Sequence, residues 1–343
     1  MIHFESDYTQ GAVPGIIKRL TETNMEMTVG YGEDEYCESA RKKIREQIEN
    51  ENADVHFLVG GTQTNLIFIA SALRAHQGVL CAETGHIQVH ETGAIEACGH
   101  KILTLPSKDG KITAEQVKTT VTAHREDPTM EHTVQPKLVY ISFPTENGTI
   151  YSKKELTDLY SVCREMKLIL YIDGARLGYG LTCKENDLTL SDIAKSCDAF
   201  YIGGTKVGAL FGEALVITKD SLKEDFRYII KQKGAMLAKG RLLGLQFDTL
   251  FTDNLYLKSA KHATDLAQRL REAFIKKGIE MHFDSPTNQL FPILTKDQHD
   301  KLAEKFVFCF WAKVGDRTAV RFCTSWATSE DDVDTLIKAI EEM

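Results

Sequence analysis

The sequence predicts an α/β fold, with a large domain on a mainly parallel sheet and a small α+β domain at the carboxyl end. Between residues 54 and 217, short apolar runs alternate with stretches of helical character, which is typical of βαβ units. After about residue 245 this alternation stops, and helices and short strands become segregated. A chain of 343 residues has room for about two domains. We therefore expect an N-terminal arm and large domain at residues 1–245, and a small domain at residues 246–343.

The segment before residue 54 is expected to hold an amphipathic surface helix. Tyr36, Ala40, Ile44 and Ile48 recur every four residues among charged side chains, so they form one apolar stripe on a helix.

The large domain then supplies seven predicted strands. Most of them are short and apolar, as strands covered on both faces should be. In order, they lie at residues 55–59, 79–82, 101–105, 137–142, 168–172, 199–202 and 214–217.

Helices are expected between these strands. Residues 66–73 form an apolar helix after the first strand. Two later helices begin with the capping-box pattern, in which a hydroxyl and a carboxyl or amide satisfy free N–H groups; these pairs are Thr113 with Gln116 and Ser152 with Glu155.

The small domain is expected to begin with a long helical stretch at about residues 235–277. Ser329 should cap a final helix, because acidic residues follow it at the first helical turn. The strands predicted between these two helices lie at residues 279–283, 289–294, 306–311 and 319–324.

Composition excludes several classes of protein. The chain is 43% hydrophobic and 26% charged, within the globular range, and its net charge of −8 offers no excess of cations for a nucleic acid. It has no apolar run of membrane-spanning length and no signal-peptide pattern at its start, so we expect a cytoplasmic protein without a membrane partner. Its eight cysteines contain no CxxC pair, which argues against a zinc site or a disulfide framework.

Two motifs place charged side chains after buried strands. Asp173 and Arg176 follow the strand at residues 168–172, where ligands of open α/β sheets bind. Lys206 lies in a glycine-rich turn after the strand at residues 199–202. Neither motif alone is specific, and Asp173 by itself could be a turn or cap residue.

A third motif is a strand followed by glycines and the apolar helix, with Gly61, Thr62 and Gln63 at the junction. The backbone N–H groups of such a turn and the positive end of the helix dipole form a phosphate cradle. Since GxxxxGK[ST] and GxGxxG are absent, a compact phosphate ester is favoured over a nucleotide. Together with Asp173 and Lys206, this cradle meets the requirements of pyridoxal phosphate: a lysine, a ring-nitrogen partner and a phosphate site.

These residues make the chain resemble the threonine aldolase and β-eliminating lyase family of pyridoxal-phosphate enzymes, which have the fold type I, aspartate aminotransferase-like architecture. The resemblance covers nearly the whole chain. It is carried, in order, by residues 4–7, 31–34, 61–63, His86 with 91–93, 173–176, 205–206 and 321–324.

The resemblance implies a pyridoxal 5′-phosphate site. In it, Lys206 forms the Schiff base, Asp173 pairs with the pyridine nitrogen and His86 stacks on the ring. Taken alone, His86 could be a solvated or core histidine. The other residues implied to contact the cofactor are Gly61, Thr62, Gln63, Arg176 and Thr205.

The resemblance also implies an amino-acid substrate whose carboxylate meets Ser6, Arg176 and Arg321. A guanidinium offers a carboxylate a planar two-point contact, although Arg321 could instead form a structural salt bridge. Tyr31 is implied to reach the site from a neighbouring subunit, because the family builds its sites at a dimer interface within a tetramer. We expect a homodimer or homotetramer, and no metal ion.

Two positions depart from the family pattern. Many members have a histidine in a Thr-His-Asn-Gly stretch, where it has been considered as a base near the substrate β-hydroxyl, whereas Glu146 stands there in this chain. Glu146 could also be a plain loop carboxylate. The arginine of the family's Met-Arg pair, which approaches the phosphate, is replaced by Leu237 after Met236, and Lys239 is the nearest cation.

We therefore predict a pyridoxal-phosphate lyase that cleaves the Cα–Cβ bond of L-threonine or L-allo-threonine to give glycine and acetaldehyde. Its catalytic residues would be Lys206, Asp173, His86 and Glu146. Three alternatives stay open: β-elimination from a tyrosine-, tryptophan- or cysteine-like substrate, transamination or racemisation, and a non-catalytic binding protein of the same fold.

Overall fold

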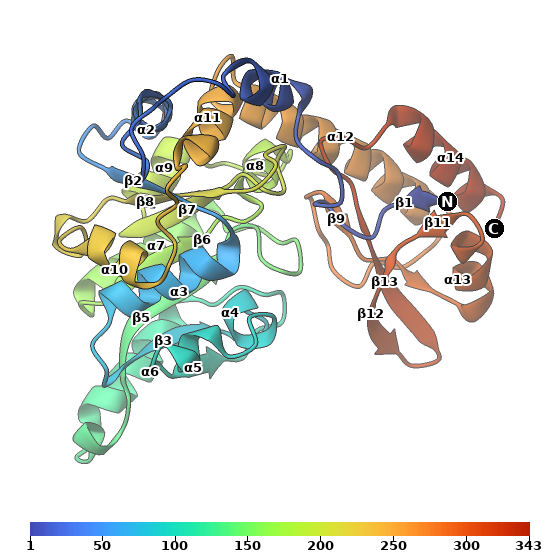
Figure 1. Ribbon diagram of the computed structural model, residues 1–343. Coiled ribbons are helices and arrows are strands. Elements are labelled where there is room, and N and C mark those ends of the chain that lie inside the picture. The colour runs from blue at the N-terminus through green and yellow to red at the C-terminus, as the bar shows by residue number, and fades with distance from the viewer.

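The computed structural model describes all 343 residues and has a larger and a smaller part, with helix α12 (Leu255–Lys276) running between them (Figure 1). The larger part holds a seven-stranded sheet, and both termini lie in the smaller part. None of the helices combines the length and apolar character that crossing a membrane requires.

The large sheet contains every strand predicted for it, with ends within two residues of those expected. Its strand order is β2-β8-β7-β6-β5-β3-β4. Only β8 runs antiparallel to its neighbours β2 and β7, so the sheet is mainly parallel. The strands are β2 (Asp54–Leu58), β3 (Gln77–Ala82), β4 (Ile102–Leu105), β5 (Gln135–Ser142), β6 (Ile169–Asp173), β7 (Ala199–Gly203) and β8 (Glu213–Ile217).

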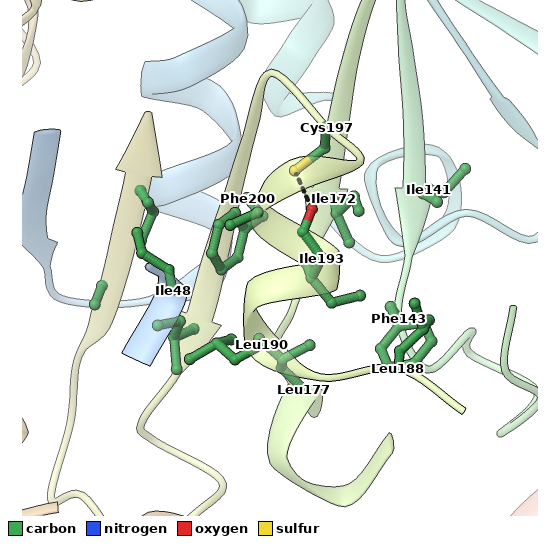
Figure 2. Packing of buried hydrophobic residues seen from close by; sticks show 14 of the residues in the cluster. Ile48, Ile141, Phe143, Ile172, Leu177, Leu188, Leu190, Ile193, Cys197 and Phe200 are labelled. Carbon is green, nitrogen blue, oxygen red and sulfur yellow. Dashed lines mark hydrogen bonds between the residues drawn. The ribbon is translucent and has the colours of Figure 1, made fainter. Parts of the chain in front are cut away.

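Helices cover both faces of this sheet, because alternate side chains of its strands point to opposite faces. Ile172 of β6 belongs to a core cluster of 44 buried residues, whereas Tyr171 beside it belongs to a cluster of 21 on the other face. Figure 2 shows part of the larger cluster, in which Ile193 of helix α9 (Leu190–Lys195) lies among buried side chains that include Ile172 and Leu190.

Each helix that covers the sheet contributes buried residues to one of these two clusters. The larger cluster draws on α1 (Pro14–Glu22), α2 (Glu35–Ile48), α6 (Ala114–Glu126), α7 (Lys153–Glu165), α8 (Leu177–Thr182), α9 (Leu190–Lys195), α11 (Arg241–Leu250) and α12. The other draws on α3 (Gly61–Ala72), α4 (His86–Val89), α5 (Ala94–Ala97) and α10 (Phe226–Gln232). Two 3₁₀ turns lie at Met130–His132 and Asp220–Leu222.

Local sequence signals explain several helix ends. Both predicted capping boxes form, at the starts of α6 and α7. Ser329 caps the last helix, α14 (Glu330–Glu341), by accepting a hydrogen bond from the Asp332 amide. Ala40, Ile44 and Ile48 of α2 are buried, as the predicted apolar stripe requires.

The smaller part differs more from the sequence-based expectation. The helical stretch predicted at 235–277 is divided into α11 and α12, because Asp253 and Asn254 adopt positive φ angles of 51° and 58°. The strand predicted at 279–283 is wrong, since only Met281 forms an isolated bridge, to Pro292. The predicted strand at 289–294 is interrupted at Pro292, which has no N–H to donate.

Short strands complete this part. The chain's second and third residues form β1, which pairs in parallel with β11, so the N-terminal arm joins the C-terminal part. The division at residues 245 and 246 stays a prediction. The remaining elements are β1 (Ile2–His3), β9 (Gln289–Leu290), β10 (Ile293–Leu294), α13 (Lys296–Ala303), β11 (Phe306–Val307), β12 (Cys309–Val314) and β13 (Arg317–Cys323).

Candidate active site

The site is built where β6 and β7 end at the same edge of the sheet. The turns after these strands touch, since the amide of Gly203 donates to the Gly174 carbonyl at 2.9 Å. A Cβ at Gly203 would lie 2.3 Å from the Ala175 carbonyl oxygen, so the approach needs glycine there. As a result, Asp173 and the turn that carries Lys206 lie side by side.

Asp173 is a buried carboxylate with four hydrogen-bond donors. Its Oδ2 accepts from the Asn65 amide at 2.9 Å and the Tyr140 hydroxyl at 2.6 Å. Its Oδ1 accepts from the Tyr201 hydroxyl at 2.5 Å and the Ala175 backbone amide at 3.0 Å.

These contacts keep Asp173 ionised. Burial alone would raise the pKa of Asp173, but the charge of His86 and the side-chain hydrogen bonds outweigh it, so the pKa lies below its ordinary value. An ionised Asp173 can form an ion pair with a positively charged group bound at the centre of the site.

The amino end of helix α3 supplies free backbone donors beside Asp173. The amides of Gly61, Thr62 and Gln63 donate to no protein acceptor, and Gly60 before them provides no side-chain cap. A Cβ at Gly61 would lie 2.9 Å from the hydroxyl of Tyr201, the residue that also binds Asp173. The cradle predicted for a phosphate is thus adjacent to the buried carboxylate.

His86 is tied to the same network through Glu91. Its Nδ1 lies 2.8 Å from Glu91 Oε1, and the Asn65 amide donates both to that oxygen, at 2.7 Å, and to Asp173. Burial lowers the pKa of His86, but the hydrogen bond to Glu91 and the surrounding carboxylates raise it more, and the pKa ends above its ordinary value.

The ligating atoms of His86, Glu91 and Asp173 lie within 4.8 Å of one another, which is close enough for a metal ion. The Asn65 amide already bridges the two carboxylates, so the arrangement is a continuous hydrogen-bond chain.

Glu146 lies against His86. Its Oε1 accepts from the His86 backbone amide at 2.9 Å and from the Ser142 hydroxyl at 2.6 Å. Burial raises the pKa of Glu146, partly opposed by the hydrogen bond from Ser142. The Glu146 carboxylate therefore contacts the backbone of His86, the residue predicted to stack on the cofactor ring.

Lys206 is half-buried, and no carboxylate lies within 4 Å of its amine. Burial lowers the pKa of Lys206, and the neighbouring charge of Arg176 lowers it further. The Nζ atom lies 5.9 Å from the ring centre of Tyr8, which belongs to the N-terminal arm. A lysine with a lowered pKa is a nucleophile, because more of it is in the neutral form at a given pH.

Arg176 meets the N-terminal arm through Asp7. Its Nε and Nη2 donate to the two oxygens of Asp7 at 2.7 and 3.0 Å, and Asn288 of the smaller part also donates to Asp7 at 2.9 Å. Burial raises the pKa of Asp7, but the charges of Arg176 and Lys206 and the hydrogen bonds from Arg176 and Asn288 together outweigh it, so the pKa lies below its ordinary value. This ion pair joins the two parts of the molecule and uses only the Nε and Nη2 atoms of Arg176.

Arg321 and Ser6 lie beyond this ion pair and have unused polar atoms. Arg321 donates weakly from Nη1 to Gln289 at 3.4 Å and from Nη2 to the Glu5 carbonyl at 3.2 Å. Its Nε and the hydroxyl of Ser6 are buried without any hydrogen-bond partner. An unpaired buried donor costs about 1 to 3 kcal/mol, so these two atoms indicate a polar ligand.

Two predicted site residues lie elsewhere or have other partners. Tyr31 is 48% exposed, and its ring centre lies 4.8 Å from the Nζ of Lys231, with no contact to Asp173 or Lys206. The Thr205 hydroxyl donates to Glu213 at 2.8 Å and accepts from the Gly212 amide at 3.0 Å.

Several residues of the site were not predicted from the sequence. Tyr140 and Tyr201 lie on β5 and β7, the strands that flank β6, and a phenolic group within an apolar strand was the signal available for them. Asp7 lies within the family-like segment at residues 4–7, but its ion pair with Arg176, like the hydrogen bond from Asn65 to Asp173, joins residues that are distant in the sequence.

The sequence of the chain is similar to those of known proteins. The sequence matches the family described as Beta-eliminating lyase over residues 3–296. A low specificity L-threonine aldolase of Pseudomonas sp. (strain NCIMB 10558) is 32% identical, over 97% of this chain and 95% of its own length. One from Pseudomonas aeruginosa is 30% identical, over 98% of this chain and 96% of its own.

Solved structures agree as well. A threonine aldolase of Leishmania major superposes with a TM-score of 0.97 at 44% sequence identity, covering 100% of this chain and 99% of that one. A mutant aspartate aminotransferase of Thermus thermophilus, at 13% identity and a TM-score of 0.69, shares the fold alone. The predicted fold type I architecture is confirmed, and the chain belongs to the β-eliminating lyase family.

Proposed function

We propose that the protein is a pyridoxal-phosphate-dependent lyase that cleaves L-threonine or L-allo-threonine into glycine and acetaldehyde. One observation carries the proposal: an ionised buried carboxylate, three free helix amides and an amine of lowered pKa meet at one edge of the sheet. The names of the relatives, which are threonine aldolases over nearly the full length, agree with it.

The residues fit pyridoxal 5′-phosphate. The amides of Gly61, Thr62 and Gln63 have no protein acceptor and would hold its phosphate, while Asp173 would pair with the ring nitrogen and Lys206 would anchor the cofactor covalently. When bound, the cofactor supplies an electron sink for the pair of electrons released at the substrate's Cα. His86 would cover the ring, and its Nδ1 contact with Glu91 fixes its orientation.

The unpaired donors of Arg321 and Ser6 are suited to the carboxylate of an amino acid. Arg321 Nε and Ser6 Oγ are both buried and unsatisfied, and a carboxylate offers two acceptor oxygens in one plane. Arg176, held by Asp7, adds a positive charge to the same region. Fixing the carboxylate orients the Cα–Cβ bond for cleavage.

Removal of the β-hydroxyl proton requires a base near the Cβ atom. His86 is our candidate for this base, because its hydrogen bond to Glu91 and the surrounding carboxylates raise its pKa and so strengthen its hold on a proton. Glu146 lies on the backbone of His86 and is our candidate for orienting the hydroxyl toward that imidazole.

A second copy of the chain would complete the site. Tyr31 does not reach Lys206 of its own chain, and it lies in an exposed segment that also carries Met25, Met27 and Val29. We infer that this segment meets a neighbouring subunit of a homodimer or homotetramer, where Tyr31 would enter the partner site. The eight free cysteines fit a reducing compartment such as the cytoplasm.

Product analysis tests the proposed reaction. Purified enzyme supplied with pyridoxal phosphate is incubated separately with L-threonine, L-allo-threonine, L-serine and L-tyrosine. Equal amounts of glycine and acetaldehyde from one or both threonine isomers are expected. Ammonia together with a keto acid, without glycine, would replace the proposal with β-elimination.

A further inference from the structure

Glu213 is a buried carboxyl group with no part in the reaction described above. It is the first residue of β8, it is 4% exposed, and it faces the turn that carries Lys206. Its Oε2 accepts from the Gly204 amide at 3.1 Å, and its Oε1 accepts from the Thr205 hydroxyl at 2.8 Å. Gly204 and Thr205 are the two residues directly before Lys206.

Gly212, the residue directly before β8, forms further hydrogen bonds with the same turn. The Thr205 hydroxyl accepts from the Gly212 amide at 3.0 Å, and the Gly204 and Thr205 amides donate to the Gly212 carbonyl at 3.0 and 3.1 Å. Glu213 is therefore the one side chain whose carboxylate ties both residues of the turn to β8. A hydrophobic residue there would leave the Gly204 amide with only the Gly212 carbonyl.

We propose that Glu213 is a positioning residue for Lys206, which fixes the turn at residues 203–206 and, when ionised, places a negative charge near the amine. The proposal rests on Lys206 being the reactive lysine of the proposed function. It assigns Glu213 no contact with the substrate.

The charges around Glu213 support this role. Burial raises the pKa of Glu213 to about 8, and the positive charge of Lys206 opposes that rise. Once it is ionised, above that pH, the Glu213 carboxylate raises the pKa of Lys206 against the lowering effect of burial and of Arg176. The titratable groups that interact with Glu213 are Lys206, Asp173, Tyr171, Tyr201 and Tyr256.

The sign of the expected effect follows from these charges. With the carboxylate removed, the ammonium form of Lys206 loses a nearby negative charge, so its pKa should fall. Glu213→Gln keeps the size of the side chain, but it retains only one acceptor atom for the two donors and carries no charge.

The test measures the basicity of Lys206 without using the reaction. Cofactor-free protein is acylated with a limiting amine-reactive reagent across a pH series, and mass spectrometry quantifies the label on the peptide that contains Lys206. We expect the midpoint of labelling to move to lower pH in Glu213→Gln. In the enzyme loaded with pyridoxal phosphate, the pH midpoint of the visible absorption band should also move, and kcat should fall about tenfold or more with little change in KM.

Asp198→Asn is the matched control. Asp198 is another buried carboxylate, 1% exposed, but it lies at the opposite end of β7, where it accepts from the Leu170 amide at 2.9 Å. Its removal should leave the labelling midpoint of Lys206 unchanged. An equal shift in both variants would overturn the proposal, because the effect would then reflect general destabilisation.

A wild-type labelling midpoint and a wild-type absorption profile in Glu213→Gln would also overturn it. If that variant does not fold, Thr205→Val removes one of the two donors to Glu213 and should shift the midpoint in the same direction; an unchanged midpoint contradicts the proposal. Because labelling needs neither cofactor nor substrate, its result is separate from a failure of the proposed reaction.

Discussion

Replacing Asp173 by asparagine should lower both the stability of the protein and its turnover. Each oxygen of the Asp173 carboxylate accepts one hydroxyl and one N–H donor. An asparagine side chain turns one of these two acceptors into an NH₂ group. The hydroxyls of Tyr140 and Tyr201 can rotate and accept, but the N–H groups of Asn65 and Ala175 cannot.

The loss of stability in Asp173→Asn can be estimated from these four donors. Whichever way the new amide is oriented, at least one buried N–H loses its acceptor, which costs about 1 to 3 kcal/mol. The remaining hydrogen bonds lose their charge assistance, so we expect a total of about 2 to 4 kcal/mol. A domain with a stability of about 5 to 15 kcal/mol would still fold.

The assay is urea denaturation of the cofactor-free protein, compared with the wild type between neutral and acidic pH. The pKa of Asp173 lies below its ordinary value of 3.8, so its stabilisation is present above that pH and is lost as the pH falls through the lowered value. The difference in free energy of unfolding between the wild type and Asp173→Asn should therefore become smaller in acid. In the loaded enzyme, kcat should fall by orders of magnitude while cofactor is still bound.

Asp173→Asn with wild-type stability and a near wild-type kcat would refute this reasoning. Asp173 would then be an ordinary turn residue, and the two tyrosines would have no role in holding its charge.

Three further predictions concern other residues. Arg321→Lys should raise KM for L-threonine about tenfold or more with a smaller effect on kcat, because a point charge cannot replace the guanidinium fork; unchanged kinetics would leave Arg321 a structural role. Glu146→Gln should lower kcat on threonine while Glu146→His retains or raises it, and changes of less than a few fold in both would make Glu146 a loop residue. His56 is buried with its pKa lowered to about 3 from 6.5, so stability should fall by up to about 5 kcal/mol as the pH drops across that interval. In His56→Phe, urea midpoints should lose this acid dependence, and an unchanged pH profile would show that other groups cause it.

The strands of the large sheet could be predicted because each is a short apolar run followed by a turn signal. The antiparallel direction of β8 and the strand order could not, because they depend on pairing between distant segments. The break between α11 and α12 falls at Asp253 and Asn254, residues that tolerate positive φ, but their effect on a long helical pattern is visible only in the folded chain. Helix α13 was missed, although Thr295 and Gln298 form a capping box at its start.

The site was predictable where chemistry follows a strand. Asp173, Lys206 and Gly61 each come after an apolar run, and the carboxyl ends of parallel strands meet at one edge. Tyr201 and Glu213, which hold Asp173 and the Lys206 turn, lie within strands, and their role appears only when neighbouring strands are paired. Tyr31 requires a second copy of the chain, so neither the sequence nor one folded chain tests it.

In the proposed site, Lys206, Asp173 and the amides at residues 61–63 hold one cofactor. Reduction of the pyridoxal-phosphate-loaded enzyme with borohydride, followed by peptide mapping, tests it most directly, with Lys206→Ala as the control. We expect one pyridoxyl group per chain, attached to Lys206, and none in the control. A pyridoxyl group on another lysine, or equal labelling of the Lys206→Ala variant, would contradict it.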